Sequence, residues 1–339
     1  MEKIIIGNEA SVPMASLSKK RLLFIPLILA ALVAFPHIVG SYLTGIFVLI
    51  GLYFISTIGI SLLMGNAGLV SLAQAAFWGI GAYGSGIMAI KFSVSPFLAI
   101  PIGMVLAGVV AYILGYLTRN LQGHYFSLAT LGFGIVINIV LIEESQLTGG
   151  PSGLIGVPSL GIGSFSIASD TAWFYVVAFI SLIVFILTRN LVQSSWGRNL
   201  RSIQDSAVAS QSMGINIGQY KLTAFVVSAV FAGLSGGLYA SYMSFISPAI
   251  FSFEMSIKFV VMAVLGGLFS IYGSLIGVIV VTLLVEVLRE IVPFVFGESA
   301  GGAVEVIFFG LLLVVMMIYM PKGIMGIVEK FNLRIRRGT

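Results

Sequence analysis

The chain has 339 residues, of which 59% are hydrophobic and 9% are charged, and its formal net charge is +5. Soluble domains carry roughly 25% charged residues, so this composition excludes a water-soluble globular protein. The apolar runs are about 20 residues long, which indicates membrane-crossing helices rather than the alternating segments of about ten residues found in a β-barrel. The chain contains no cysteine, which excludes disulfides and thiolate metal sites.

Ten apolar segments are predicted to be transmembrane helices, so we expect an all-α polytopic membrane protein. A polar N-terminal arm at 1–21 precedes a single membrane domain at 22–320, and a basic tail follows at 321–339. An alternative assigns 1–36 to a signal peptide, which removes the first helix and leaves the orientation of the rest unchanged. The ten segments are 22–40, 42–64, 69–90, 96–118, 124–142, 171–189, 221–243, 254–268, 271–292 and 301–320.

Two of these segments are expected to be irregular. The third, 69–90, is interrupted by polar and glycine residues, and the eighth, 254–268, is short for a crossing. Each is predicted to be a broken or re-entrant element. The ten helices also divide into two groups of five, and since five is odd, the second group would be inverted relative to the first. Such halves are typical of transporters, where the substrate route lies between them.

The placement of Lys and Arg predicts the orientation of the chain. These residues are concentrated in the N-terminal arm, at Arg119, in and beside a polar segment at 190–220, and in the tail. With ten crossings and the arm inside, all these regions and both termini lie in the cytoplasm. The 143–170 loop then lies outside, and it carries acidic but no basic residues.

The polar segment 190–220 interrupts an otherwise apolar sequence. Ser202 and Asp205 have the spacing of a capping box, and Gly214 offers a helix stop. These features predict a helix at 203–213 with small side chains, which can enter a groove on another protein. The alternative is a solvated connector that contains a capped helix.

Six stretches of sequence point to a known family. They are 190–220, 68–83 (GLVSLAQAAFWGIGAY), 125–134 (YFSLATLGFG), 147–153 (LTGGPSG), 264–274 (VLGGLFSIYGS) and 319–326 (YMPKGIMG). With these motifs in the family's order, the chain resembles the membrane permease subunit of branched-chain amino-acid ABC importers over about 40–326. It departs from the family pattern at Ala73, often Gly, at Tyr272, often Pro, and at 206–211, which is poorer in acids.

The resemblance implies a fold of the large-importer ABC permease type, with about ten helices, in the cytoplasmic (inner) membrane of a prokaryote. It implies that the protein moves branched-chain, aliphatic amino acids by alternating access. The implied partners are cytoplasmic ATP-binding subunits, a second permease subunit and an extracytoplasmic substrate-binding protein. The polar segment 190–220 then corresponds to the cytoplasmic coupling loop, and 143–170 to an extracytoplasmic loop.

The resemblance also implies two sets of site residues. The ATPase-coupling set is Arg198, Arg201, Ser202, Asp205, Ala209, Met213, Gly214, Ile215 and Asn216. The candidate translocation pathway is Gln74, Phe77, Trp78, Thr130 and Phe133. For Gln74 two roles stay open, because an uncharged polar side chain within a span can line the route or hydrogen-bond between helices.

The residues themselves indicate that the chain is not an enzyme. It has no Gly-x-x-x-x-Gly-Lys-Ser/Thr phosphate loop, so ATP is expected to be used by partner subunits. No catalytic or metal-ligand cluster is present, no bound cofactor is expected, and the basic residues at the membrane edges do not indicate nucleic-acid binding. Three charged residues fall within predicted spans and are expected either to take part in function or, as the alternative, to snorkel to the membrane surface or pair between helices: Lys258, Glu286 and Glu305.

Alternative functions remain open from the sequence. A permease of the same superfamily for urea, short amides, nucleosides or sugars would carry the same motifs. An ion-coupled secondary transporter would take up substrate without ATPase partners, although no Asp/Glu/His relay runs through the spans. An intramembrane enzyme would need clustered His, Asp or Glu, which the sequence lacks.

Overall fold

The computed structural model describes residues 34–119, 121, 123–162, 165–167, 169–296, 310–311 and 324–325. The described chain is almost entirely helical, and residues 34–39 are also helical. The helices are α2 (Ser41–Ala67), α3 (Gln74–Lys91), α4 (Pro96–Thr118), α5 (His124–Glu143), α6 (Ser145–Thr148), α7 (Asp170–Gln193), α8 (Ser195–Asp205), α9 (Ala207–Ser212), α10 (Ile217–Met243), α11 (Phe253–Gly266) and α12 (Ile271–Phe296), with 3-10 turns η1 (Gly150–Ser152) and η2 (Pro248–Phe251).

Six of these helices are long and apolar enough to cross a membrane: α2, α4, α5, α7, α10 and residues 271–289 of α12. The fold is therefore that of an all-α polytopic membrane protein. The second to ninth predicted spans coincide with helices to within a few residues at most ends. The first and tenth, 22–40 and 301–320, lie largely outside the described residues.

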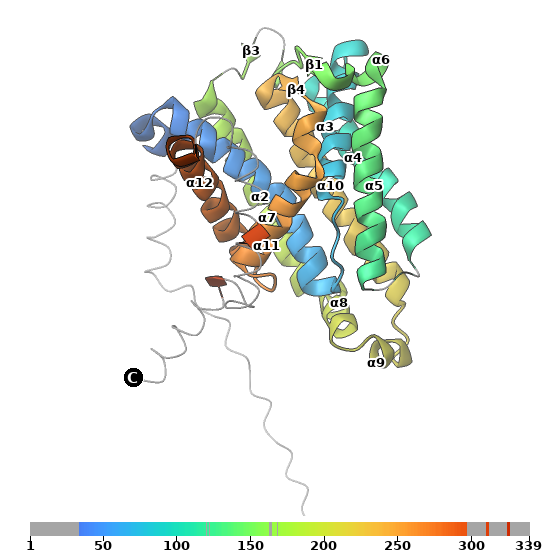
Figure 1. Ribbon diagram of the computed structural model, residues 1–339. Coiled ribbons are helices and arrows are strands. Elements are labelled where there is room, and N and C mark those ends of the chain that lie inside the picture. Colours follow the sequence, from blue (N-terminus) through green and yellow to red (C-terminus); the bar gives the residue numbers. More distant parts are fainter. Residues whose placement is uncertain are drawn as a thin grey trace, which may run out of the picture.

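Helices α2 and α10 form the centre of the bundle (Figure 1). Their apolar stretches are 78% and 67% buried, whereas those of α4, α5, α7 and α12 are between 17% and 33% buried. Helix α3 packs against α10 without room for side chains at the contact. A Cβ atom added at Gly236 would lie 1.9 Å from the carbonyl oxygen of Trp78, and one at Gly81 would lie 2.2 Å from that of Gly233. Glycine at these positions is what lets the two backbones approach.

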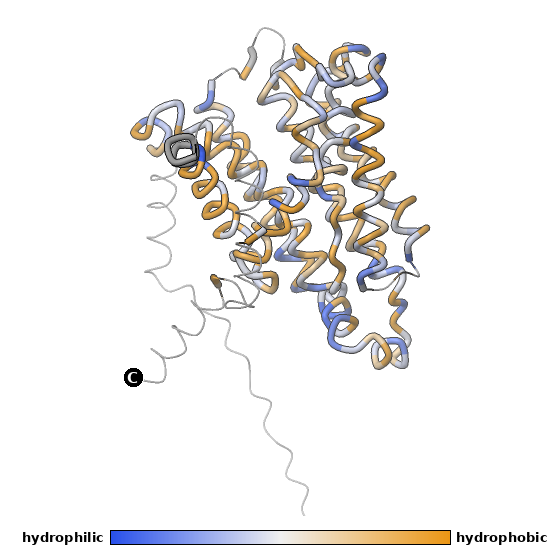
Figure 2. Tube along the Cα trace, in the orientation of Figure 1, coloured by the Kyte–Doolittle hydropathy of each residue, from blue (hydrophilic) through white to orange (hydrophobic). Residues whose placement is uncertain are grey.

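The polar segment and the 143–170 loop lie at opposite ends of the bundle, as Figure 1 shows for α8 and α9 on one side and α6, β1 and β4 on the other. We call these the polar-segment end and the loop end. Figure 2 shows hydrophilic residues gathered around α8 and hydrophobic ones along α5. The prediction that these two segments lie on opposite sides of the membrane is consistent with this arrangement.

The loop end is closed by short antiparallel strands. Strand β1 (Leu154–Ile155) pairs with β4 (Phe245–Ile246), and β2 (Gly161–Ile162) pairs with β3 (Phe165–Ser166). The carboxylate of Asp170 then ties three helices together, because it accepts hydrogen bonds from Ser41 at 2.5 Å and from Tyr242 at 3.1 Å.

Two helices begin inside the bundle rather than at its ends. Helix α2 ends at Ala67, Gly68 adopts a left-handed conformation with φ 65°, and the chain is not helical again until Gln74. On the opposite side, α10 ends before Ser244 with φ 55°, and β4 and η2 lead into the 14-residue α11. The third predicted span is therefore a non-helical entry followed by an uninterrupted helix, rather than a helix broken at its glycines, and the eighth is short, as the sequence indicated.

Candidate coupling surface and interior contacts

The polar segment folds into two helices joined at Ser206. Helix α8 covers Ser195–Asp205 and α9 covers Ala207–Ser212. The prediction of one helix at 203–213 that starts with a capping box at Ser202 was therefore wrong. Ser202 lies within α8, where its hydroxyl donates to the carbonyl of Asn199, and Asp205 is the last residue of that helix.

Two other serines cap these helices. Ser194 accepts from the backbone N–H of Gly197, and Ser206 accepts from that of Ala209. Both have the extended backbone that an N-cap residue requires. The capping-box pattern misled the prediction because the start of α8 is decided by where α7 ends, and a local pattern does not contain that information.

The end of the second helix agrees with the sequence. Gly214 has φ 80°, and the N–H of Ile215 donates to the carbonyl of Ser210, which closes the last turn of α9. Asn216 then caps α10 by accepting from the N–H of Gln219 at 3.2 Å. Gly214, Ile215 and Asn216 thus form the turn between α9 and a membrane-crossing helix.

Helix α8 is fixed to the membrane domain by both apolar and polar contacts. Two of its own apolar side chains, Leu200 and Ile203, are buried. The guanidinium of Arg201 donates to the carbonyl of Val192 at 2.7 Å, and that of Arg198 donates to the carbonyl of Gln193 at 2.9 Å. These two cations satisfy carbonyl groups at the C-terminal end of α7, where a positive charge is favourable.

Contacts that the sequence did not reveal join α8 to α10. The indole of Trp196 donates to Thr223 at 3.1 Å, and the amide of Asn199 donates to Tyr220 at 2.8 Å. The side chain of Gln204 lies against Gly68, at the break between α2 and α3. The two residues of each pair are 21 to 27 positions apart in sequence, so no local sequence pattern predicts that they meet.

Helix α9 projects beyond α8 and exposes apolar side chains. Val208 is 79% exposed and Met213 is 81% exposed, although both lie on a segment that is otherwise polar. Ala209 is also exposed, while the hydroxyl of Ser210 bonds to that of Ser202 at 3.2 Å and holds α9 against α8. An exposed apolar tip on a polar projection is typical of a surface that contacts another protein.

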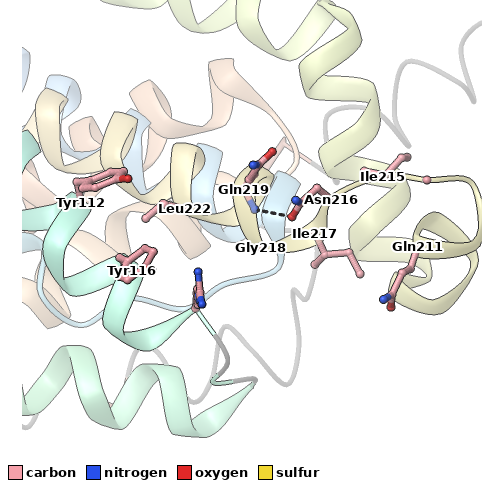
Figure 3. A pocket seen from close by; sticks show the side chains of 11 residues that line it. Tyr112, Tyr116, Gln211, Ile215, Asn216, Ile217, Gly218, Gln219 and Leu222 are labelled. Atoms are coloured by element: carbon pink, nitrogen blue, oxygen red, sulfur yellow. Dashed lines mark hydrogen bonds between the residues drawn. The ribbon is translucent and has the colours of Figure 1, made fainter.

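A hollow of about 760 Å³ separates this projection from the end of α4 (Figure 3). On one side it is lined by Tyr112, Tyr116 and Arg119, whose guanidinium stacks 4.4 Å from the centre of the Tyr116 ring. On the other side it is lined by residues of the turn and the start of α10: Gln211, Gly214, Ile215, Asn216, Ile217, Gly218, Gln219 and Leu222. The predicted coupling residues 214–216 thus line an open cavity.

In the interior, Gln74 forms hydrogen bonds between helices, which is one of the two roles that the sequence left open for it. Its amide nitrogen donates to the carbonyl oxygen of Ser56 at 2.8 Å, and its amide oxygen accepts from Ser228 at 3.2 Å. The side chain is 1% exposed and joins α2, α3 and α10. A role in lining the route stays a prediction.

The other candidate pathway residues lie in the packed core or at its edge. Phe77 is stacked on Phe133 with ring centres 5.4 Å apart, and Trp78 donates to Ser235 at 3.1 Å. Thr130 is fully buried, and its hydroxyl accepts from the N–H of Leu72, which pins the non-helical stretch between α2 and α3 to α5. Four of the five candidates are buried in this conformation, and their role in transport stays a prediction.

The charged residues predicted within spans have different surroundings. Glu286 accepts from the hydroxyl of Tyr42 and lies 3.8 Å from Arg289, so its carboxylate joins α2 to α12. Lys258 is half-buried, and Glu305 lies outside the described residues. In the part of the chain that the structure describes, no three His, Cys, Asp or Glu residues are placed to hold a metal ion.

Comparison with known protein families identifies the family of this chain. Residues 42–318 match the family described as "Branched-chain amino acid transport system / permease component". The chain belongs to this family. The match begins at the start of α2 and continues past α12, so it includes the α2–α3 junction and the α8–α9 projection.

Several curated permeases are similar to the chain. The "high-affinity branched-chain amino acid transport system permease protein LivM" of Escherichia coli K12 is 29% identical, with 94% of this chain and 78% of LivM aligned. BraD of Pseudomonas aeruginosa, with a corresponding name, is 26% identical over 81% of this chain and 91% of BraD. The probable permease LivH of Methanocaldococcus jannaschii is 24% identical over 84% and 92%. No solved structure is a significant match.

Proposed function

We propose that the chain is the transmembrane permease subunit of an ATP-driven importer that moves branched-chain aliphatic amino acids by alternating access. The observation that carries this is the α8–α9 projection, an anchored helix followed by a short one with an exposed apolar tip. A chain without a phosphate loop needs a partner to hydrolyse ATP, and the projection offers that partner a surface. The names of the related permeases support the substrate class.

The proposed orientation puts the polar-segment end in the cytoplasm. The concentration of Lys and Arg at this end and in both terminal regions supports this choice. One of the ATP-binding subunits then docks on α9 and in the adjacent hollow, and an extracytoplasmic binding protein docks at the loop end. A second permease subunit completes the membrane domain.

The contacts around α8 provide a route for coupling. A force on α9 passes to α8 through the Ser210–Ser202 contact, and from α8 to α7 through Arg201 and to α10 through Asn199. Gln204 contacts Gly68, at the break between α2 and α3. ATP-driven closure therefore acts on helices whose irregular segments can change the access of the route.

The same geometry supports an organisation in two inverted halves. Helices α2 and α10 both have 27 residues and run in opposite directions. Each is followed by an irregular stretch and then by a helix that starts inside the bundle, α3 after α2 and α11 after α10. Broken helices in matching positions of two halves are the arrangement found around the substrate sites of many transporters.

The docking surface is tested by making its apolar tip charged. The double variant Val208→Asp, Met213→Asp is expected to lose co-purification with the ATPase subunits and substrate-stimulated ATP hydrolysis, while the apolar control Val208→Leu, Met213→Leu retains both. Both positions are exposed, so the permease should still fold. Unchanged co-purification and coupling in the charged variant would show that α9 is not the docking element, and uptake by the permease alone would favour an ion-coupled carrier.

A further inference from the structure

Glu254 is a carboxylate inside the membrane domain. It is in the first turn of α11, which starts within the bundle. Two contacts on either side of Glu254 give its depth in the bundle. Before it, the carbonyl of Phe251 accepts a hydrogen bond from Asn138, which is five residues from the loop end of α5. After it, Phe259 packs on Tyr53, which is twelve residues from the loop end of α2. At 1.5 Å per residue, Glu254 lies about 8 to 18 Å in from the loop end.

The carboxylate is exposed at this depth. The next two residues, Met255 and Ser256, are buried, whereas Phe253 is 40% exposed and Glu254 is exposed as well. No hydrogen bond or ion pair joins Glu254 to another described residue. A charged group at this depth is costly in contact with lipid, so such groups almost always face a water-filled cavity or a polar partner.

Two other acidic groups near the loop end, Asp170 and Glu286, are engaged in the fold. Asp170 is bonded to Ser41 and Tyr242, and Glu286 accepts from Tyr42 and lies beside Arg289. Glu254, by contrast, is next to the point where α3 and α11 meet, because Ser256 accepts a hydrogen bond from the N–H of Ala75 in the first turn of α3. Substrate sites of transporters form at such discontinuities.

From this placement we propose that Glu254 lines the substrate route on its extracytoplasmic side and binds the ammonium group of the transported amino acid. The inference rests on the proposed function, because it assumes a zwitterionic substrate. A charge-assisted hydrogen bond between a carboxylate and an ammonium group supplies recognition that an apolar route for an aliphatic side chain lacks. Lys258 lies one turn further along the same helix face, and the proposal does not depend on it.

Access of water to this position is tested with a cysteine. Because the permease contains no native cysteine, Glu254→Cys in the reconstituted complex gives a single thiol in this chain. A cationic, membrane-impermeant methanethiosulfonate reagent added from the extracytoplasmic side should modify it, because the reactive thiolate requires water. Leucine-loaded binding protein should slow the modification several-fold.

The matched control is Val105→Cys on α4. Val105 is 57% exposed and lies nine residues, about 14 Å, from the loop end of its helix, in an apolar stretch. It should resist the reagent. Equal resistance of Glu254→Cys and Val105→Cys, with or without substrate, would overturn the proposal that Glu254 lines an aqueous route.

The binding role is tested by uptake. Glu254→Gln should lower kcat/KM for leucine uptake by roughly ten-fold or more, as expected for loss of one charge-assisted hydrogen bond, and Glu254→Asp should retain part of it. Assembly of the complex should stay unchanged, because Glu254 is exposed and its replacement removes no contact of the fold. Equal uptake by wild type and Glu254→Gln would contradict the proposed binding of the ammonium group and would leave the labelling result unaffected. Absence of amino-acid uptake by the wild-type complex would instead overturn the proposed function, and the labelling experiment would still decide whether Glu254 lines a route.

Discussion

The hydroxyl of Ser228 donates a hydrogen bond to the amide oxygen of Gln74 across 154 positions of sequence. The amide nitrogen of the same side chain donates to Ser56. One glutamine therefore joins the two central helices, α2 and α10, to the start of α3. Buried polar groups in a membrane domain contribute stability only when their hydrogen bonds are made, so this site is sensitive to substitution.

Replacement of Gln74 by leucine should destabilise the permease. The change leaves the hydroxyl of Ser228 and the carbonyl of Ser56 without their partner, which we expect to cost about 1–3 kcal/mol. Thermal unfolding of the detergent-solubilised complex measures the effect. Gln74→Glu, which keeps the shape and the acceptor, serves as the comparison. A normal unfolding temperature together with altered uptake in Gln74→Leu would assign Gln74 to the route instead.

Gly236→Ala should separate α3 from α10. The added methyl group would lie 1.9 Å from the carbonyl oxygen of Trp78, so the helices must move apart, at a cost of about 1–3 kcal/mol or more. Gly132→Ala on α5 is the matched control, because a Cβ there meets nothing within 4 Å. A lower yield and unfolding temperature are expected for Gly236→Ala only. Equal behaviour of the two variants would contradict the tight α3–α10 contact.

Ser206→Ala should loosen α9. Its hydroxyl caps this six-residue helix, and loss of an N-cap costs roughly 0.5–2 kcal/mol. Hydrogen exchange of the amides at 207–212 should become faster, with little change elsewhere. Asp205→Asn is the control, since Asp205 ends α8 and caps neither helix. If Asp205→Asn accelerated exchange as much as Ser206→Ala, the capping box predicted from the sequence would be right after all.

Arg201→Ala should weaken the connection between α8 and α7. The guanidinium donates to the carbonyl of Val192 at 2.7 Å, and its loss frees carbonyl groups at the end of α7. We expect fewer substrate molecules moved per ATP hydrolysed, measured by parallel uptake and ATPase assays in proteoliposomes. Arg189→Ala removes an exposed cation from the same helix end and should leave the ratio unchanged. A normal ratio in Arg201→Ala would mean that coupling does not pass through this contact.

Hydropathy and motif spacing predicted much of the architecture. The spans from the second to the ninth, the short eighth span and the stop at Gly214 all depend on local sequence, because an apolar run long enough to cross a bilayer has few alternatives to a helix. The family assignment also followed from the sequence. The predicted start of the helix in the polar segment was wrong. Serines at 194, 202 and 206 could each have been an N-cap, and the end of α7 determines that Ser194 and Ser206 are the caps.

By itself, therefore, the sequence determined the class of protein, the order of its helices and the family. The tertiary structure decided which polar side chains meet. Gln74 finds Ser228, Ala75 finds Ser256 and Arg201 finds Val192 only after helices far apart in the chain have packed, and Glu254 is distinguished only by its exposure beside a helix break. The physical reason is that helix formation in a membrane is governed by local hydrophobicity, whereas hydrogen-bond partners and exposure depend on contacts between helices.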